Sequence, residues 1–561
     1  MIKNLILLSF LLITGNLMAE KPNVVMIVLD DLNDYVGVMG GHPQAKTPNI
    51  DRLAGQGILF NNAHSNAPVC SPSRASFMTG ISPLTSRNYG FKNWLQNSIL
   101  LNSKTIPEYI RENGYDAYQT GKILHNKKNG IWTQQGEKTD YGPFAFDGKK
   151  VALHPATPEG MAPLGALDST FASLADTPEV NGHKGWVNNK WNKTTPFRYV
   201  SDEDRDLMTD EKSLEWFKSK MAKLEKNKNA KPFFFAVGII RPHTPLVVPQ
   251  KYFDMFPLDK ITLPEVTKDD ISDCKLAEAN GGTLRGRQAY YGLIGKNNDR
   301  QIHKKYIQSY LASVAFADEM VGGILATIEQ SRFKENTVVM LFSDHGYSLG
   351  EKEYLWKYNL WEESTRVPLI IKHPKYTANA GKTVDHPVSL IDIFPTVKEI
   401  CSLTGPTKIN SKGADIDGHS LVPFLENPQT EKWEGPKVAI TSITSYKSLR
   451  PEDQHLSIRS KDFRYIRYAN GSEELYDHRK DSHEWLNLAE NPEYSSIKNE
   501  LKNEMEKLIQ KSNSKSSSST VTEKTGEEWK DIYFKKFPEA DTNKDGELSW
   551  PEFHAHKKMK K

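Results

Sequence analysis

Three apolar runs, each followed at once by charged or imidazole side chains, constrain the fold of this chain most strongly. The runs and the groups after them are residues 23–29 with Asp30-Asp31, residues 231–240 with Arg241-Pro242-His243, and residues 337–343 with Asp344-His345-Gly346. Unbroken apolar runs are typical of parallel strands that are covered on both faces. Since functional groups collect beyond the carboxyl ends of such strands, we expect these side chains to lie at one edge of a sheet.

Helical periodicity between these runs predicts the rest of the architecture. Apolar residues recur at three- and four-residue steps in residues 302–330, and shorter helices are expected at 49–54 and 106–113. Alternating helices and strands indicate an α/β fold with a large, doubly wound, mostly parallel sheet flanked by helices, which we place at residues 20–430. From there to residue 510, short alternating strands and a final helix predict a smaller C-terminal antiparallel sheet plus helix.

The composition excludes several classes of protein. The 561 residues carry 73 Lys+Arg against 70 Asp+Glu, a net charge of +3, so there is no basic excess for nucleic-acid binding. With 38% hydrophobic and 25% charged residues, the chain is neither collagen-like, nor wholly disordered, nor a polytopic membrane protein. Its 3 cysteines, Cys70, Cys274 and Cys401, are too few for a disulfide scaffold, which leaves one of them as a candidate for chemistry.

The N-terminus is typical of an exported protein. Lys3 precedes an apolar stretch at residues 5–13, and small residues at Gly15 and Ala19 precede a polar segment, which is the pattern of a cleaved secretory signal. The alternative is a buried first helix, because the apolar run is too short to span a bilayer. We therefore expect a signal peptide at residues 1–19, a secreted or periplasmic protein, and no membrane anchor, since no cysteine lies near the cleavage point.

The C-terminal tail carries a separate motif. A Ser-rich segment at residues 511–522 predicts a flexible linker, and residues 523–561 are expected to hold a helix and a single EF-hand-like loop. Residues 541–552 read DTNKDGELSWPE, which matches an EF-hand calcium loop, with Gly546 at its sharp turn. The predicted Ca²⁺ ligands are Asp541, Asn543, Asp545, the carbonyl of Glu547, and Glu552. The alternative is an exposed acidic turn.

A short motif around Cys70 indicates the chemistry. Residues 68–80 read PVCSPSRASFMTG, in which Cys70 and Arg74 belong to a C-x-P-S-R pattern. This segment resembles the nucleophile motif of the type I, formylglycine-dependent sulfatases of the alkaline phosphatase superfamily. The resemblance implies that a formylglycine-generating maturation enzyme oxidises Cys70 to formylglycine, whose hydrated aldehyde is the nucleophile. The alternative for a lone cysteine is a buried apolar thiol.

The resemblance extends over roughly residues 21–510 and implies further site residues. The implied metal ligands are Asp30, Asp31, Cys70, Asp344 and His345. The implied catalytic residues are Cys70, Arg74, Lys122, His125, His243 and Lys357. The text SDHGYSLGE and the Pro-His-x-Pro segment are most similar to the iduronate-2-sulfatase-like branch of the family.

Sulfate-ester chemistry requires residues of these types. A sulfate ester must be held against its own charge while sulfur is attacked, so the site needs a divalent cation, cationic side chains and an acid for the leaving oxygen. Three aspartates make a hard oxygen cage suited to Ca²⁺, with Mg²⁺ as the competitor, whereas a neutral imidazole such as His345 is an unusual calcium ligand. Lys122 and Lys357 would hold sulfate oxygens as point charges.

The spacing of Arg74 and the family resemblance of the two histidines suggest roles for these residues. Arg74 lies about one helical turn beyond Cys70 and could fix the hydrated aldehyde and the metal-side oxygens. The resemblance implies that His243 protonates the departing sugar oxygen and that His125 deprotonates the second hydroxyl, so that sulfate is expelled and the aldehyde returns.

Substrate-contacting residues are harder to identify from the sequence. Residues 126–199 lack long periodic elements and carry Trp132, Trp186 and Trp191, which either stack on sugar faces or anchor loops. The candidate contacts at the rim of the site are His42, Arg87, Asn88, Trp94 and Lys357.

The predicted function is hydrolysis of sulfate esters on a sulfated, uronate-containing oligo- or polysaccharide. The resemblance to the iduronate-2-sulfatase-like branch suggests iduronate 2-sulfate units as the substrate. The export signal and the C-terminal calcium loop also fit a protein that degrades an algal polysaccharide such as ulvan. One alternative is a phosphodiesterase or phosphonate monoester hydrolase of the same superfamily. The other is a non-catalytic glycan-binding homologue.

Overall fold

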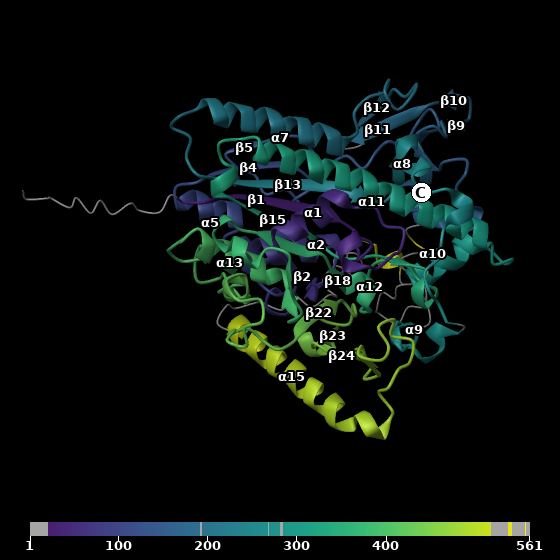
Figure 1. The fold of residues 1–561 in the computed structure, drawn as a ribbon. Helices are drawn as coiled ribbons and strands as arrows, with labels where there is room; N and C mark the ends of the chain where they lie inside the picture. The colour runs from purple at the N-terminus through teal and green to yellow at the C-terminus, as the bar shows by residue number, and fades with distance from the viewer. Residues whose placement is uncertain are drawn as a thin grey trace, which may run out of the picture.

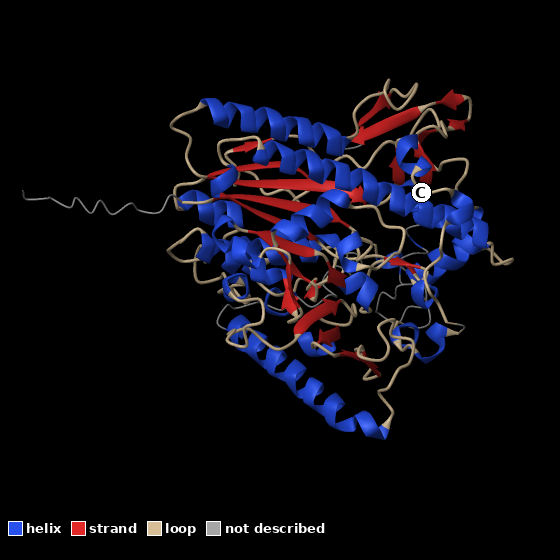
Figure 2. Ribbon diagram, in the orientation of Figure 1, coloured by secondary structure: helices blue, strands red, loops and turns tan. Residues whose placement is uncertain are grey.

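A large mixed sheet lies at the centre of the molecule (Figures 1 and 2). The computed structural model describes residues 21–190, 193–267, 269–280, 284–517, 537–540 and 556. Its strands follow the order β20-β2-β19-β15-β1-β13-β4-β5, and β19 pairs antiparallel with both neighbours, whereas the other pairs are parallel. The strands are β1 (Asn23–Asp30), β2 (Ile58–Phe60), β4 (Asp116–Gly121), β5 (Gln134–Gln135), β13 (Phe233–Pro242), β15 (Thr337–Ser343), β19 (Leu369–Lys372) and β20 (Lys382–Val384).

Helices cover both faces of this sheet, because the central strands are apolar on both sides. Val25, Ile27 and Leu29 of β1 join one hydrophobic core, and the alternate residues Val24 and Met26 join the other. The first core contains α1 (Pro48–Gln56), α7 (Thr209–Lys226) and α11 (Arg300–Glu329). The second contains α2 (Cys70–Thr79), α5 (Ile106–Glu112), α13 (Ile393–Ile400) and α14 (Val422–Glu426). The predicted α/β class with a large, mostly parallel sheet is confirmed.

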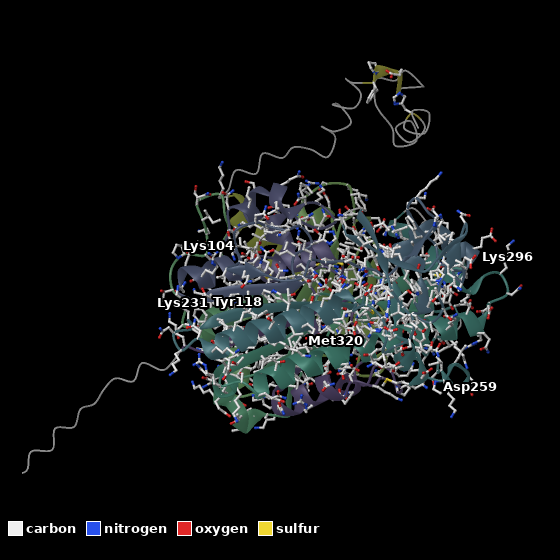
Figure 3. The ribbon with its side chains drawn as sticks, turned by 90° about the horizontal axis from the view of Figure 1, so that it is seen from above. Lys104, Tyr118, Lys231, Asp259, Lys296 and Met320 are labelled. Carbon is white, nitrogen blue, oxygen red and sulfur yellow. The ribbon has the colours of Figure 1, made fainter. Side chains whose placement is uncertain are left out.

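Helix α11 is long and apolar enough to cross a membrane by length and composition alone. Within the apolar window that meets this criterion, 78% of the residues are buried inside the protein. Figure 3, with Met320 labelled, shows α11 lying along the body of the fold. Its apolar side chains therefore serve the first core.

The C-terminal subdomain is a four-stranded antiparallel sheet closed by one long helix (Figure 1), as predicted. Its elements are β22 (Ala439–Ile443), β23 (His455–Arg459), β24 (Phe463–Arg467), β25 (Glu473–Asp477) and α15 (Ser495–Ser517). Leu501, Met505 and Ile509 of α15 pack against this sheet.

The prediction of a flexible linker from residue 511 is wrong for its first part. Helix α15 continues to Ser517, because Ser512 is buried and the Lys515 ammonium pairs with Asp417 at 2.6 Å. A Ser-rich composition predicts flexibility, and it cannot reveal tertiary contacts such as these two, which stabilise the helix. The predicted signal peptide (1–19) and the calcium loop (541–552) lie outside the described residues.

Acid is expected to weaken the C-terminal subdomain through His455. Its ring is 1% exposed, and Nδ1 accepts a hydrogen bond from the Ala469 amide at 3.1 Å. Burial, with a smaller effect of Lys447, lowers the pKa of His455 from 6.5 to about 4. As the pH falls, the unfolded chain takes up this proton first, so stability is lost between about pH 6.5 and pH 4.

The matched variant is His455→Gln, which keeps a polar side chain without the titration. Denaturant unfolding at pH 7 and pH 4.5 should show that the wild type loses about 2–3 kcal/mol more than the variant. An equal loss in the two proteins would contradict this account of His455.

Candidate active site

Four adjacent strands deliver the predicted site residues to one edge of the sheet. Asp344 follows β15, Asp30 ends β1, His243 follows β13 and Lys122 follows β4. These strands are neighbours in the order β15-β1-β13-β4 and run parallel, so their carboxyl ends meet. Asp31, directly after β1, has φ of 64°, a conformation that Asp tolerates better than most residues.

Cys70 begins the fully buried helix α2 and faces this edge. Its Sγ lies 3.5 Å from Asp30 Oδ1, 3.4 Å from His345 Nε2 and 3.4 Å from Lys357 Nζ. Burial, and next the charge of Asp30, raise the pKa of the Cys70 thiol above its ordinary value. Because the thiolate is the nucleophilic form of cysteine, an unmodified Cys70 is a poor nucleophile at neutral pH.

Three cations neutralise three aspartates around Cys70. Arg74 Nε donates to Asp344 Oδ2 at 2.7 Å, and its NH2 lies 3.3 Å from Asp30 Oδ1. Lys122 pairs with Asp30, and Lys357 Nζ donates to Asp31 Oδ1 at 2.7 Å. Arg74 is wholly buried and holds two carboxylates in place, while its predicted role in fixing the hydrated aldehyde stays a prediction.

The two neighbouring aspartates differ in their proton affinity. Burial raises the pKa of Asp30, but Lys122, His243 and Arg74 outweigh it and hold that pKa well below the ordinary value. Burial raises the pKa of Asp31 to about 7, against the lowering effect of Lys357. Asp31 Oδ2 is also buried and has no hydrogen-bond partner among the residues that the structure describes. A divalent cation beside this oxygen would hold Asp31 in its charged form.

The donor atoms at this edge fit a metal ion. Ligand atoms of Asp30, Cys70, Asp344 and His345 lie within 4.8 Å of one another, as do those of Asp30, Asp31, Cys70 and His243. His345 Nδ1 faces the Gly346 carbonyl at 2.9 Å, so a proton there leaves the Nε2 lone pair directed at the cluster. The carboxylates are hard oxygen ligands of the kind that Ca²⁺ and Mg²⁺ prefer.

The two predicted proton-transfer histidines occupy different positions. His243 is buried, with Nδ1 at 2.5 Å from the Thr244 carbonyl and Nε2 at 3.9 Å from Asp31 Oδ2. Burial, and next Lys357, hold the pKa of His243 well below its ordinary value. His125 is exposed at the surface, and desolvation of its ring, and next the charge of Lys122, lower its pKa to about 4. Both imidazoles are therefore neutral at pH 7 without substrate.

Lys357 is held in place by an unusual backbone conformation. Its neighbours Trp356 and Tyr358 have φ of 95° and 75°, which bulky side chains rarely adopt. The Tyr358 amide donates to the Pro68 carbonyl at 3.1 Å, which ties this turn to the segment before Cys70. Such strain is typical of functional sites, and here it directs the Lys357 ammonium to Asp31 and Cys70.

Several predicted rim residues are buried or have partners elsewhere in the fold. Trp94 is fully buried and donates to the Asn126 carbonyl, and Trp132 and Trp186 are also buried. His42 is buried with Nε2 at 3.0 Å from the Thr262 carbonyl, and Arg87 donates to Leu84 and Asn513. Asn88 is buried as well, and Trp191 lies outside the described residues. The tryptophans described here anchor loops.

Sequence reasoning missed aromatic residues beside the predicted groups. The Tyr141 ring lies 5.0 Å from Lys122 Nζ and 4.8 Å from the His243 ring, and the Phe91 ring lies 5.8 Å from that of His125. No local motif marks either residue, because each is brought to the site by a long loop.

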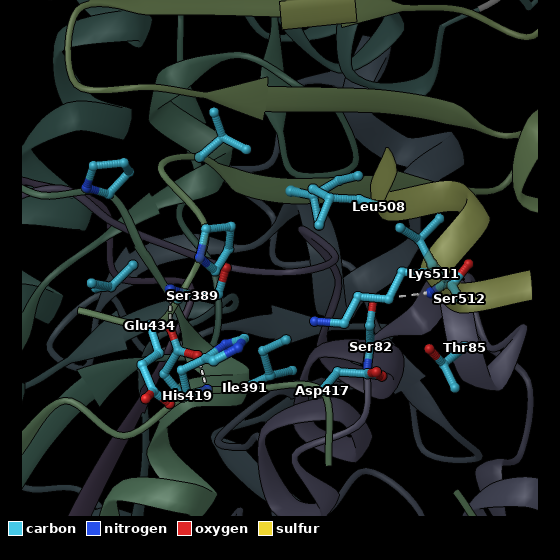
Figure 4. A pocket seen from close by; sticks show the side chains of 18 of the residues that line it. Ser82, Thr85, Ser389, Ile391, Asp417, His419, Glu434, Leu508, Lys511 and Ser512 are labelled. Carbon is cyan, nitrogen blue, oxygen red and sulfur yellow. Dashed lines mark hydrogen bonds between the residues drawn. The ribbon is translucent and has the colours of Figure 1, made fainter. Parts of the chain in front are cut away.

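A cavity of about 220 Å³ lies between the large domain and helix α15 (Figure 4). Apolar residues such as Leu508 and Ile391 line it together with Asp417, His419 and Lys511. None of the predicted site residues lines this cavity, so it is separate from the aspartate cluster.

Comparisons with known proteins agree with this geometry. Residues 22–401 match the family described as Sulfatase, and residues 350–511 match the one described as N-sulphoglucosamine sulphohydrolase, C-terminal. A protein named Sulfatase from Formosa agariphila is 33% identical over 483 residues, which cover 85% of each chain. The iduronate 2-sulfatase of Mus musculus is 31% identical over 429 residues, covering 70% of this chain and 71% of the relative.

Two further matches widen the range of relatives. The ulvan-active sulfatase of Formosa agariphila is 28% identical over 488 residues, covering 86% of this chain and 80% of the relative. The crystal structure of the phosphonate monoester hydrolase of Agrobacterium radiobacter has a TM-score of 0.64 at 21% identity, covering 88% of this chain and 96% of that one. The latter likeness establishes a shared fold.

Proposed function

The chain belongs to the sulfatase family and is a sulfuric ester hydrolase, and we propose that it acts on a sulfated, uronate-containing oligo- or polysaccharide. The iduronate 2-sulfatase and the ulvan-active sulfatase among its relatives support a sulfated glycan of this kind. The observation that carries the proposal is the cluster of Cys70 with three aspartates, two lysines and an arginine at the sheet edge.

In this proposal, the reactive form of Cys70 is formylglycine, made by a maturation enzyme. The raised pKa of the buried thiol supports conversion, because the unmodified side chain would remain protonated at neutral pH. One hydroxyl of the hydrated aldehyde attacks sulfur, and the S–O bond to the sugar breaks. The second hydroxyl then loses its proton, sulfate leaves from the same carbon, and the aldehyde is restored.

The charged residues divide the work of binding and proton transfer. Asp30, Asp31, Asp344 and His345 would hold Ca²⁺, or Mg²⁺ in its place, which supplies positive charge to the sulfate oxygens. Lys122 and Lys357 lie close enough to the same carboxylates to contact those oxygens as well.

The two histidines transfer protons at opposite ends of the reacting group. His243 protonates the departing sugar oxygen once the anionic ester raises its pKa, and His125, neutral above about pH 4, accepts the proton of the second hydroxyl. His243 is buried beside Asp31, whereas His125 is exposed, so in this proposal each histidine serves a different oxygen.

The protein is also proposed to be exported from the cytoplasm. The apolar leader at residues 5–13 supports export to the periplasm or the medium, where polymeric glycans are met. Amino-terminal sequencing of the exported protein should begin near Glu20, and an intact leader on active protein would contradict it.

The direct test of function compares ester classes on the matured enzyme. Defined sulfated disaccharides, phosphate diesters and phosphonate monoesters are assayed side by side, and we expect sulfate esters to be turned over fastest. Faster phosphodiester turnover would favour the phosphodiesterase alternative, and no turnover of any ester would favour a glycan-binding homologue. Mass spectrometry of the peptide containing Cys70 should show sulfur replaced by an aldehyde oxygen.

Substitution of one aspartate should distinguish metal binding at the aspartate cluster from metal binding at the EF-hand-like loop. Asp344→Asn is expected to weaken metal binding at the cluster at least about 10- to 100-fold and to remove the thermal stabilisation that the ion gives. Calcium titration calorimetry and thermal melts measure this directly, without turnover. The matched control is Asp545→Asn in the EF-hand-like sequence, which should abolish only a second, independent binding event. Unchanged affinity at the cluster in Asp344→Asn would contradict the predicted ligand set.

A further inference from the structure

Two exposed aromatic rings stand beside the mouth of a site whose other side chains are largely buried. Phe91 is 52% exposed and Tyr446 is 78% exposed, although burial of such rings is worth a few kcal/mol. Tyr446 also has φ of 60°, a strained conformation for a tyrosine. Because these exposed rings contribute little to the hydrophobic core, their place next to catalytic residues points to a role in ligand binding.

A ring contact and a hydrogen bond connect the segment of Phe91 to the active site. The Phe91 ring centroid lies 5.8 Å from that of His125, and Ser71 Oγ, directly after Cys70, donates to the Lys92 carbonyl at 3.1 Å. Residues 91 and 92 therefore rest on the first turn of the nucleophile helix α2.

Tyr446 reaches the same mouth from the C-terminal subdomain. Tyr358 Oη donates to Tyr446 Oη at 3.0 Å, and Tyr358 immediately follows Lys357. A Cβ placed on Gly90 would lie 3.8 Å from Tyr358 Oη, so the segment with Phe91 borders that with Tyr358. Phe91, Tyr358 and Tyr446 therefore lie on adjoining segments beside the site, and the three are here called the aromatic rim.

The charges around the aromatic rim favour an anionic ligand. Lys92 and Lys447 are exposed neighbours of the two outer rings. Within the described residues, neither ammonium lies within ion-pair distance of a carboxylate, although Lys447 acts at longer range on Asp453 and its Nζ donates to the Ala469 carbonyl at 3.4 Å. Aromatic faces pack against the apolar C–H face of a sugar, while free ammonium groups attract carboxylate or sulfate groups.

We propose that Phe91 and Tyr446 form a stacking subsite for the sugar that adjoins the sulfated residue of an anionic oligosaccharide. This inference rests on the proposed function and adds a specificity-determining surface to it. Tyr358 is a positioning residue, since its hydroxyl holds Tyr446 in place. A small aryl sulfate has no adjoining sugar and leaves the aromatic rim uncovered.

The experiment compares Phe91→Ala and Tyr446→Ala with the parent on two substrates. For a sulfated tetrasaccharide, kcat/KM should fall roughly tenfold per ring, mainly through KM. For 4-nitrophenyl sulfate, the Tyr446→Ala change, which lies away from the proposed base His125, should alter kcat/KM less than about twofold. Tyr446→Phe keeps the ring and should retain most of the tetrasaccharide activity.

The matched control is Tyr376→Ala on the opposite edge of the sheet. Tyr376 follows β19, whose last residue pairs with Val339 near the start of β15, so it lies away from the strand ends that carry the site. This variant should behave as the parent on both substrates. Equal losses on both substrates in Phe91→Ala and Tyr446→Ala, or no loss on either, would overturn the proposal.

A binding measurement separates failure of this proposal from failure of the proposed function. In a Cys70→Ala background, calorimetry with the same tetrasaccharide should show about tenfold weaker binding when either ring is removed. If the parent lacks turnover but ring-dependent binding persists, the aromatic rim stands and the sulfatase proposal for this substrate fails. If binding is equal with and without the rings, the aromatic rim proposal is overturned whatever the turnover.

Discussion

Replacing Cys70 with alanine is expected to lower sulfate-ester turnover by at least about 10⁴-fold while the protein stays folded. Loss of a covalent nucleophile removes the reaction path itself, and comparable losses in other hydrolases reach about 10⁶-fold. The side chain is small and begins helix α2, so alanine fits the same place with little change in packing. Initial rates on a sulfated disaccharide, with thermal melts of both proteins, measure the two effects separately.

The matched control for this prediction is Cys274→Ala. Cys274 is also buried, and burial raises its pKa well above the ordinary value, yet it lies near Tyr476 in a different hydrophobic cluster. Its variant should keep full turnover and shows the cost of deleting a buried thiol. Residual activity above about 1% in Cys70→Ala, beyond any contamination, would mean that another group attacks sulfur.

The aspartate cluster could be predicted from the sequence because its signal is local. An apolar strand that stops at a charged residue identifies both the strand and the edge on which its last side chain lies, as at Asp30 and Asp344. The same reasoning predicted the central strands of the sheet. It did not predict that β19 runs antiparallel, since a four-residue strand has no directional signal.

Residues on loops could not be predicted in the same way. Trp94 is a predicted rim contact, but its side chain is fully buried. Phe91, three residues earlier, is instead exposed beside the site. Arg74 has the predicted spacing from Cys70, but spacing does not specify which carboxylates its guanidinium contacts, here Asp344 and Asp30. Tyr446 joins the site from a separate subdomain, and only tertiary structure makes it a neighbour of Tyr358.

Arg464→Met is expected to destabilise the protein by about 3–5 kcal/mol, because it leaves two buried carboxylates without their shared cation. Arg464, on β24, is 1% exposed on its side chain, and Nε donates to Glu484 Oε1 at 2.5 Å. Its NH2 pairs with Glu362, and its NH1 donates to Leu360 and Ser457. Although burial opposes ionisation, Arg464 and His478 lower the pKa of Glu484 to about 2, so its charge is present at neutral pH. Denaturant unfolding at pH 7 measures the loss.

This network has a consequence for the active site as well as for stability. Glu362 begins α12 (Glu362–Thr365), and the Ser364 carbonyl in that helix accepts a hydrogen bond from the Gly346 amide at 3.0 Å, next to His345. The C-terminal sheet therefore braces the segment that carries a predicted metal ligand.

The decisive control for Arg464→Met removes the stranded charge. Adding Glu484→Gln to the variant should restore most of the stability lost at that carboxylate, since Glu362 keeps its ion pair with Arg459 while Glu484 loses its Arg464 cation. Arg464→Met alone should also lose less relative to wild type at pH 5 than at pH 7, because the Glu484 carboxyl, without Arg464, takes up a proton as the pH falls. A loss below about 1 kcal/mol at pH 7, or no recovery in the double variant, would show that packing rather than charge pairing holds the C-terminal sheet against the catalytic domain.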